Sequence, residues 1–130
     1  MKLLKNISLF ILIIGYLYAG VNHFREPGSY IRIIPRYIPA PKLVNVLAGI
    51  FEILFGLMLV FKATRSWAAR GIILMLIAFL PVHIQMVIDA PLQLGSLTVT
   101  PLIAWGRLAL QPVLMLWAWW YVRAEKYTYP

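Results

Sequence analysis

The chain of 130 residues has no cysteine, and only 12% of its residues are charged, four of them acidic. Without cysteine it cannot form disulfides, thiol relays, iron–sulfur clusters or Cys-ligated zinc sites of its own. Soluble domains carry about 25% charged residues, so half of the charge that a water-facing surface normally uses is missing. These two shortages exclude thiol chemistry within the chain and argue against a soluble catalytic domain.

The sequence is instead dominated by apolar residues, which make up 62% of it. A chain this short buries only part of its surface on folding, so the excess apolar area must face lipid. At about 20 residues for each span, there is room for four transmembrane helices and short connections. We therefore predict a single domain over residues 1–130, an all-α integral membrane protein folded as an antiparallel bundle of four transmembrane helices.

Four long apolar runs predict the spans, at about 7–24, 43–61, 67–88 and 101–122. Each run is near the length that crosses a bilayer and is too uniformly apolar for a water-facing helix. The basic start before the first run would also suit a cleaved signal peptide. However, 17–20 is a poor cleavage site and the run continues to His23, which favours a retained helix.

The connections differ in kind. The segment 62–66 is short and predicts a tight turn between the second and third spans. The link 25–42 is longer and contains four prolines, which interrupt helix and exclude a fifth span. Its middle, 30–38, mixes apolar, aromatic and basic residues, as an interfacial segment does. It is either an ordinary interfacial anchor or a lid over the bundle.

Basic residues near the ends of the spans predict the orientation. Seven fall on one side of a four-span protein, namely Lys2, Lys5, Lys62, Arg65, Arg70, Arg123 and Lys126. Four fall on the other side, namely Arg25, Arg32, Arg36 and Lys42. This distribution favours a plasma (inner) membrane protein with both termini in the cytoplasm. Because the basic residues are dispersed and form no basic face, we expect no nucleic-acid binding.

Polar groups inside the spans are the informative part of the sequence, since an ionisable group there costs roughly 2.5–3.5 kcal/mol on insertion scales. The candidates are His23, Glu52, His83, Asp89 and Arg107, with Asn22, Gln85 and Gln111 as neutral partners. Antiparallel threading puts them all in the half of the bilayer beneath the proline-rich link. Glu52, for example, lies about 15 Å beyond Lys42 along a helix.

Helical spacing groups these residues into three stripes: Gly15, Ala19 and His23; Gly49, Glu52 and Gly56; and Ala104, Arg107, Gln111, Leu114 and Ala118. The glycines of the second stripe would allow a close helix approach beside the carboxylate. Pro81 is expected to free a backbone carbonyl and to kink the third span. We expect Glu52 to pair with Arg107, since each would otherwise be an uncompensated charge in a low dielectric.

Two interpretations of this polar layer stay open. The network either locks the helices together or forms a ligand pocket, with Glu52 and Arg107 at its floor and His23 and His83 at its rim. A proton path is a less favoured interpretation, because no chain of polar residues continues through the other half of the bilayer. A haem or metal site is also a less favoured interpretation, because the two histidines lack the local spacing of metal-ligand motifs. We therefore predict no metal. The Trp-rich stretch 117–121 is typical of an interfacial aromatic belt.

The polar residues also carry a family resemblance. The chain resembles DoxX-like membrane proteins from His23 to Trp119, through Ala19-Gly20-Val21-Asn22-His23-Phe24, Pro39-Ala40-Pro41, Gly49-Ile50-Phe51-Glu52, Thr64-Arg65, Pro81-Val82-His83, Trp105-Gly106-Arg107-Leu108 and Gln111. The resemblance implies a four-helix bundle. DoxX-like relatives include a membrane subunit associated with thiosulfate:quinone oxidoreduction and partners in oxidative-stress complexes. Distantly similar animal proteins are assembly chaperones.

The resemblance implies a membrane component of an oxidoreductase system that binds a quinone-like or lipid-like molecule. We expect the ligand-binding residues to be His23, Glu52, His83, Arg107 and Gln111. The candidate partners are the lipid bilayer, a membrane or redox protein, and a second copy of the chain. The alternative is a non-enzymatic assembly or scaffolding factor. A small-solute transporter is disfavoured, because 130 residues make half of a typical inverted-repeat unit.

Overall fold

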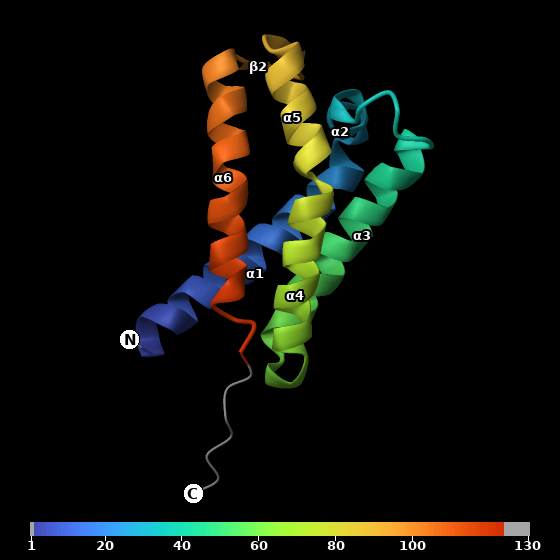
Figure 1. Cartoon of the computed structure of the whole chain (residues 1–130). Helices are drawn as coiled ribbons and strands as arrows, with labels where there is room; N and C mark the ends of the chain where they lie inside the picture. The colour runs from blue at the N-terminus through green and yellow to red at the C-terminus, as the bar shows by residue number, and fades with distance from the viewer. Residues whose placement is uncertain (1, 124–130) are drawn as a thin grey trace, which may run out of the picture.

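A computed structural model describes residues 2–123 of the chain. Its elements are α1 (Lys2–Arg25), α2 (Pro27–Ile33), α3 (Pro41–Val60), α4 (Lys62–Ala78), α5 (Leu80–Asp89), β1 (Leu92–Leu94), β2 (Leu97–Val99) and α6 (Pro101–Trp119) (Figure 1). By length and composition, four helical stretches could cross a membrane: Lys2–Arg25, Pro41–Val60, Lys62–Asp89 and Pro101–Trp119. The predicted four-helix organisation is therefore confirmed at the level of helices long and apolar enough to span.

The long helices run alternately up and down, so the bundle is antiparallel (Figure 1). α1 crosses the others obliquely and packs mainly against α3, while α4 packs against α3 and α6, and α5 against α6. Only 17–28% of the residues in the apolar windows of these helices are buried. Large apolar side chains therefore cover the outside of the bundle, as the excess of apolar residues predicted.

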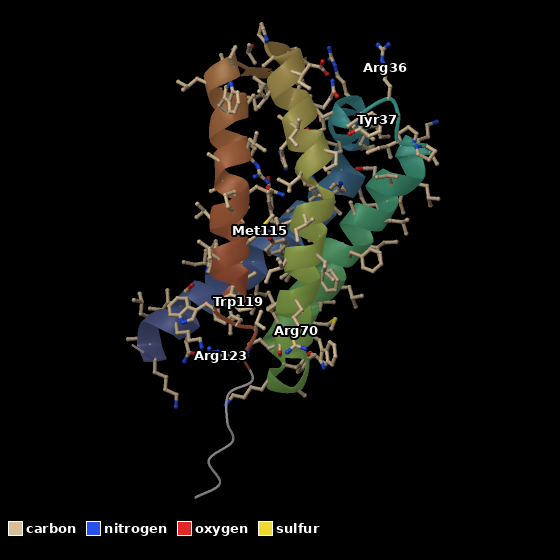
Figure 2. The ribbon with its side chains drawn as sticks, in the orientation of Figure 1. Arg36, Tyr37, Arg70, Met115, Trp119 and Arg123 are labelled. Atoms are coloured by element: carbon tan, nitrogen blue, oxygen red, sulfur yellow. The ribbon has the colours of Figure 1, made fainter. Side chains whose placement is uncertain are left out.

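We distinguish two ends of the bundle. The α3–α4 end contains the turn at Phe61, the beginning of α1 and the end of α6, and the α2 end contains α2 and the β1–β2 hairpin (Figure 1). The largest apolar core lies toward the α3–α4 end and includes Leu12, Leu59 and Ile72. Figure 2 shows Arg36 at the α2 end, and Arg70 and Arg123 at the other end. Lys126, which was counted with the latter group, lies outside the described residues.

The third predicted span differs most from expectation. The turn that precedes it is a single residue, Phe61, because α4 begins at Lys62 rather than at about residue 67. The span is also divided at Phe79 into α4 and α5. Pro81 stands at the start of α5, where its missing N–H prevents a continuous hydrogen-bond ladder. The expected kink at this proline is thus a break between two helices.

Two short elements at the α2 end were not predicted. The proline-rich link contains helix α2, which begins at Pro27, where a proline is tolerated because the first helical N–H needs no intrahelical partner. Between α5 and α6, β1 and β2 form an antiparallel hairpin in which Leu92 faces Val99 and Leu94 faces Leu97. Gly95 supplies the positive φ of its turn. Val99 is buried with Met86 and Ala104 in a second, smaller core.

Candidate functional site

A cavity of about 470 Å³ lies among the helices at the α2 end. Its wall is mostly apolar, and the polar side chains in it come from all four candidate spans and from α2. The lining residues are Ala19, His23, Tyr30, Ile33, Ile34, Ile38, Val44, Asn45, Ala48, Glu52, Ala78, Phe79, Val82, His83, Met86, Leu94, Leu97, Val99, Ile103 and Arg107. An apolar cavity with a few convergent polar groups is the usual form of a small-molecule site.

His23 is held on three sides. Its Nδ1 lies 2.8 Å from Asn45 Oδ1, and Asn45 Nδ2 donates to the main-chain oxygen of His23 at 3.1 Å. Its Nε2 lies 3.1 Å from Glu52 Oε2. The ring stacks on Tyr30, with centroids 3.8 Å apart and planes inclined by 27°. These contacts fix the imidazole between α1, α2 and α3.

The contacts with Asn45 also locate one proton of this cluster, the one on Nδ1 of His23. Because the Asn45 amide donates with Nδ2, its oxygen faces Nδ1 of His23, which must carry a proton to donate to it. Glu52 Oε2 is buried and accepts no well-aligned hydrogen bond. The polar group that it contacts is Nε2 of His23. One more proton between Nε2 and the carboxylate makes this contact attractive. With that proton on either atom, the His23–Glu52 pair has no net charge.

The expected pairing of Glu52 with Arg107 was wrong. Glu52 pairs with His23, whereas Nη1 of Arg107 donates to Oε1 of Gln111 at 2.9 Å. No acidic side chain among residues 2–123 forms an ion pair with Arg107. The prediction failed because it matched opposite charges by their depth alone. The close packing of α1 against α3 instead places His23 within contact distance of the Glu52 carboxylate.

The break in the third span positions Arg107 indirectly. Helix interruption leaves main-chain carbonyls without intrahelical donors, and they need other partners in a dry interior. The fully buried Gln111 donates from Nε2 to the carbonyl oxygen of Leu76, at 2.7 Å, just before the break. This bond orients the amide so that Oε1 accepts from Arg107. Gln111 therefore directs the guanidinium to the cavity wall from the break between α4 and α5.

His83 comes from α5 and is buried, with 8% of its surface exposed. Its Nδ1 is buried without a hydrogen-bond partner, although buried polar atoms in proteins usually have one. A polar atom left in this state on a cavity wall is a candidate contact for a ligand. In the part of the chain that the structure describes, no group of three or more His, Cys, Asp or Glu side chains is arranged to hold a metal ion.

A second cavity, of about 320 Å³, shares Ala19, Glu52, Phe79 and Arg107 with the first. It extends between α1 and α6, and its remaining lining residues are Ile11, Leu12, Gly15, Tyr16, Leu76, Leu114 and Trp117. Toward the α3–α4 end, α1 and α6 are joined by hydrogen bonds. Trp117 Nε1 donates to Ser8 Oγ at 2.7 Å, and the Tyr121 hydroxyl donates to the main-chain oxygen of Lys5 at 3.0 Å.

Tyr30 lies in α2, outside the four long helices, and covers the first cavity. Its hydroxyl accepts a hydrogen bond of 2.9 Å from Asn22 Nδ2. Burial raises the pKa of the Tyr30 phenol above its ordinary value, so this side chain stays neutral and continues to stack on His23. α2 therefore contributes a fixed aromatic wall to the site.

The comparison with known families gives one match relevant to this site. The model of the family described as Domain of unknown function (DUF8561) matches residues 12–122. The chain belongs to this family. The DUF8561 match includes every residue that lines the first cavity. Comparison with curated proteins and with solved structures finds no match.

Within this DUF8561 chain, the structure brings together four of the predicted residues on the wall of the first cavity: His23, Glu52, His83 and Arg107. Gln111 lies behind Arg107 and supports it. Asp89 is not at the site. It is exposed at the end of α5 and accepts a hydrogen bond from Gln85 at 3.1 Å.

Sequence reasoning missed Asn45 and Tyr30. A signal for Asn45 was available, because Asn45, Gly49, Glu52 and Gly56 recur every three or four residues and all are buried. On α1, the stripe of Gly15, Ala19 and His23 lines the two cavities but does not make the close backbone contact with α3. Gly15 is exposed, and the close approach to α3 is made by Gly20, where an added Cβ would lie 2.9 Å from the Gly49 oxygen.

Proposed function

We propose that this DUF8561 chain is an integral membrane protein of the plasma (inner) membrane with both termini in the cytoplasm. The proposal is supported by four helices of sufficient length and apolar character and by the apolar outer surface. Arg70 and Arg123 lie at the α3–α4 end together with the beginning of α1 (Figure 2). Since basic residues concentrate on the cytoplasmic side, this end would face the cytoplasm.

We further propose that the first cavity binds a quinone-like or lipid-like molecule. One observation carries this proposal: an apolar cavity of about 470 Å³ is lined by ionisable side chains from all four candidate spans, three of them buried. Buried ion pairs can specify which helices meet, but locking requires neither a cavity nor a polar atom left without a partner. The orphaned Nδ1 of His83 therefore favours a ligand over a purely structural network.

The resemblance to DoxX-like proteins suggests the setting: a membrane component of an oxidoreductase system. The residues are compatible with an accessory role, because Arg107, His23 and His83 can bind and orient a polar head group. The chain has no cysteine, so thiol or sulfur chemistry would come from a membrane or redox protein partner. Any electron transfer would be supplied by that partner or by the bound molecule.

The test is to purify the protein in a neutral detergent, extract it with organic solvent and identify retained molecules by mass spectrometry. We expect one amphiphilic molecule per chain in the native protein. Arg107→Gln removes the cationic group of the cavity while keeping a polar side chain, and should reduce the retained amount at least several-fold. Arg70→Gln is the matched control, because Arg70 is exposed on α4 and lies over Trp67 instead of lining the cavity.

An empty cavity in the native protein, or equal retention by the two arginine variants, would contradict the binding proposal. The function would then be the alternative, a non-enzymatic assembly or scaffolding factor. One observation favours that alternative, namely the His23–Asn45–Glu52 cluster that joins α1 to α3. In that case Glu52→Gln should destabilise the bundle and leave cellular function intact once folding is rescued.

A further inference from the structure

The charges around the first cavity do not cancel. The His23–Glu52 pair has no net charge, because Asn45 fixes the proton on Nδ1 and one more proton lies between Nε2 and the carboxylate. Arg107 is always protonated, and the acceptor it contacts is the neutral amide of Gln111. Among the described residues, the wall of the cavity therefore has an excess of one positive charge.

The same wall has polar atoms that are left without partners. The Arg107 guanidinium has five N–H groups, of which one is used by Gln111. Nδ1 of His83 is buried without a partner on the same wall. A partly buried cation and an imidazole that can donate together suit an oxyanion, because charge-assisted hydrogen bonds are roughly twice as strong as neutral ones.

The second cavity gives this polar region an apolar extension. The two cavities meet at Glu52, Phe79 and Arg107, and the second continues between α1 and α6 along the walls formed by Leu12 and Leu114. Toward the α3–α4 end, Trp117 lies on its wall and donates to Ser8 of α1. A polar region therefore adjoins an apolar one, the arrangement that an amphiphilic molecule needs.

We propose that the ligand is an amphiphile with an acidic head group, held by Arg107 and His83, and an alkyl tail that lies in the second cavity between α1 and α6. This inference rests on the proposed function, because it specifies the class of molecule that the same cavity binds. The acidic head is either that of a free alkyl acid or that of an anionic membrane lipid, which share the chemistry that Arg107 recognises.

The experiment measures binding of dodecanoate, dodecanol and dodecylammonium to delipidated protein in neutral detergent by native mass spectrometry. These probes share one tail and differ in the head. We expect one dodecanoate per chain, bound about tenfold more tightly than the other two probes. Arg107→Gln should weaken dodecanoate binding by about tenfold and leave dodecanol binding unchanged, which also shows that the variant is folded. Arg70→Gln should change neither.

The tail is tested by filling the second cavity. Gly15 lines that cavity, and a Cβ added there meets no atom within 4 Å, so Gly15→Leu adds bulk at the cavity wall without a backbone clash. It should weaken binding of dodecanoate and spare that of hexanoate, whose tail is shorter. Gly106→Leu is the matched control, since Gly106 is equally open and lines neither cavity. Equal effects of the two variants would overturn the placement of the tail.

The source of the acidic head is tested by competition with phosphatidylglycerol. Displacement of dodecanoate identifies an anionic lipid, absence of displacement identifies a free alkyl acid, and both results support an acidic head. If dodecanol binds as tightly as dodecanoate, or if Arg107→Gln weakens both equally, the acidic head is refuted while the proposed function stands. If no probe binds and no amphiphile is retained on purification, both proposals fail.

Discussion

The two ends of the bundle are built by the same long helices but fill the space between them differently. At the α3–α4 end, apolar side chains such as Leu59 and Ile72 pack with no exposed surface. Polar side chains there bond to the ends of helices or join α1 to α6: Arg65 donates from Nε to the main-chain oxygen of Leu59 at 2.8 Å, and Trp117 donates to Ser8. At the α2 end, the apolar core is small, and ionisable side chains surround a cavity.

This difference indicates that one end of the bundle provides stability and the other provides the binding site. Close packing without voids stabilises a bundle, whereas a cavity forgoes contacts that its lining atoms could have made. Buried ion pairs seldom add stability over apolar packing of the same volume. The α3–α4 end should therefore determine stability and the α2 end binding, and substitutions at the two ends should affect different measurements.

The largest effect is expected from Leu59→Ala. Leu59 has no exposed surface, so truncation leaves a void in the main core and should lower the free energy of unfolding by about 2–5 kcal/mol. Leu57, which is half exposed on the same helix, is the matched control, and Leu57→Ala should cost much less. Thermal or denaturant unfolding in detergent measures both. If Leu59→Ala also abolishes ligand binding in protein that is still folded, the two ends are not separable.

A smaller effect is expected where α1 crosses α3. A Cβ at Gly20 would lie 2.6 Å from Cγ1 of Ile53 and 2.9 Å from the main-chain oxygen of Gly49, so Gly20→Ala must push the helices apart. We expect a loss of about 1–3 kcal/mol, as for other overpacked sites. Gly15→Ala is the control, because its Cβ would be in open space. Equal stability of the two variants would contradict the close approach that holds His23 near Glu52.

The helices could be predicted because four runs of about 20 apolar residues have the length and composition that a helix crossing a bilayer needs. The finer boundaries could not. The start of α4 at Lys62 depends on packing at the turn, and the break at Phe79 depends on how α6 satisfies the freed carbonyl of Leu76. The hairpin at 92–99 escaped detection because its strands are three residues each, too short for a recognisable alternation.

Four of the residues at the site could be predicted, but their pairings could not. Depth along the helices placed His23, Glu52, His83 and Arg107 in one layer, and these four do line one cavity. Which of them touch depends on side-chain reach and on the crossing of α1 with α3, neither of which helical spacing specifies. Asp89, which was a polar candidate but not an expected ligand-binding residue, lies just past the apolar part of its helix, at an exposed end.

The smallest effect is expected from Tyr30→Phe, which tests whether α2 contributes to stability or only to the wall of the cavity. The variant keeps the ring that stacks on His23 and loses the hydrogen bond from Asn22. A single neutral hydrogen bond contributes about 0.5–1.5 kcal/mol, so the loss of unfolding free energy at about pH 8 should fall in that range. Tyr18→Phe is the control, because Tyr18 is an exposed tyrosine on α1.

The pH dependence of this difference sharpens the test. Burial raises the pKa of Tyr30 in the folded state, so the folded protein holds the phenolic proton more tightly than the unfolded chain does. Stability from this group is then complete below the ordinary pKa of about 10 and is lost as the pH rises above it. The advantage of the native protein over Tyr30→Phe should therefore shrink above about pH 10, while other titrating groups cancel in the comparison. A difference that stays constant would mean that water reaches the phenol in the folded protein, and α2 would then be a loose interfacial anchor instead of a fixed wall of the site.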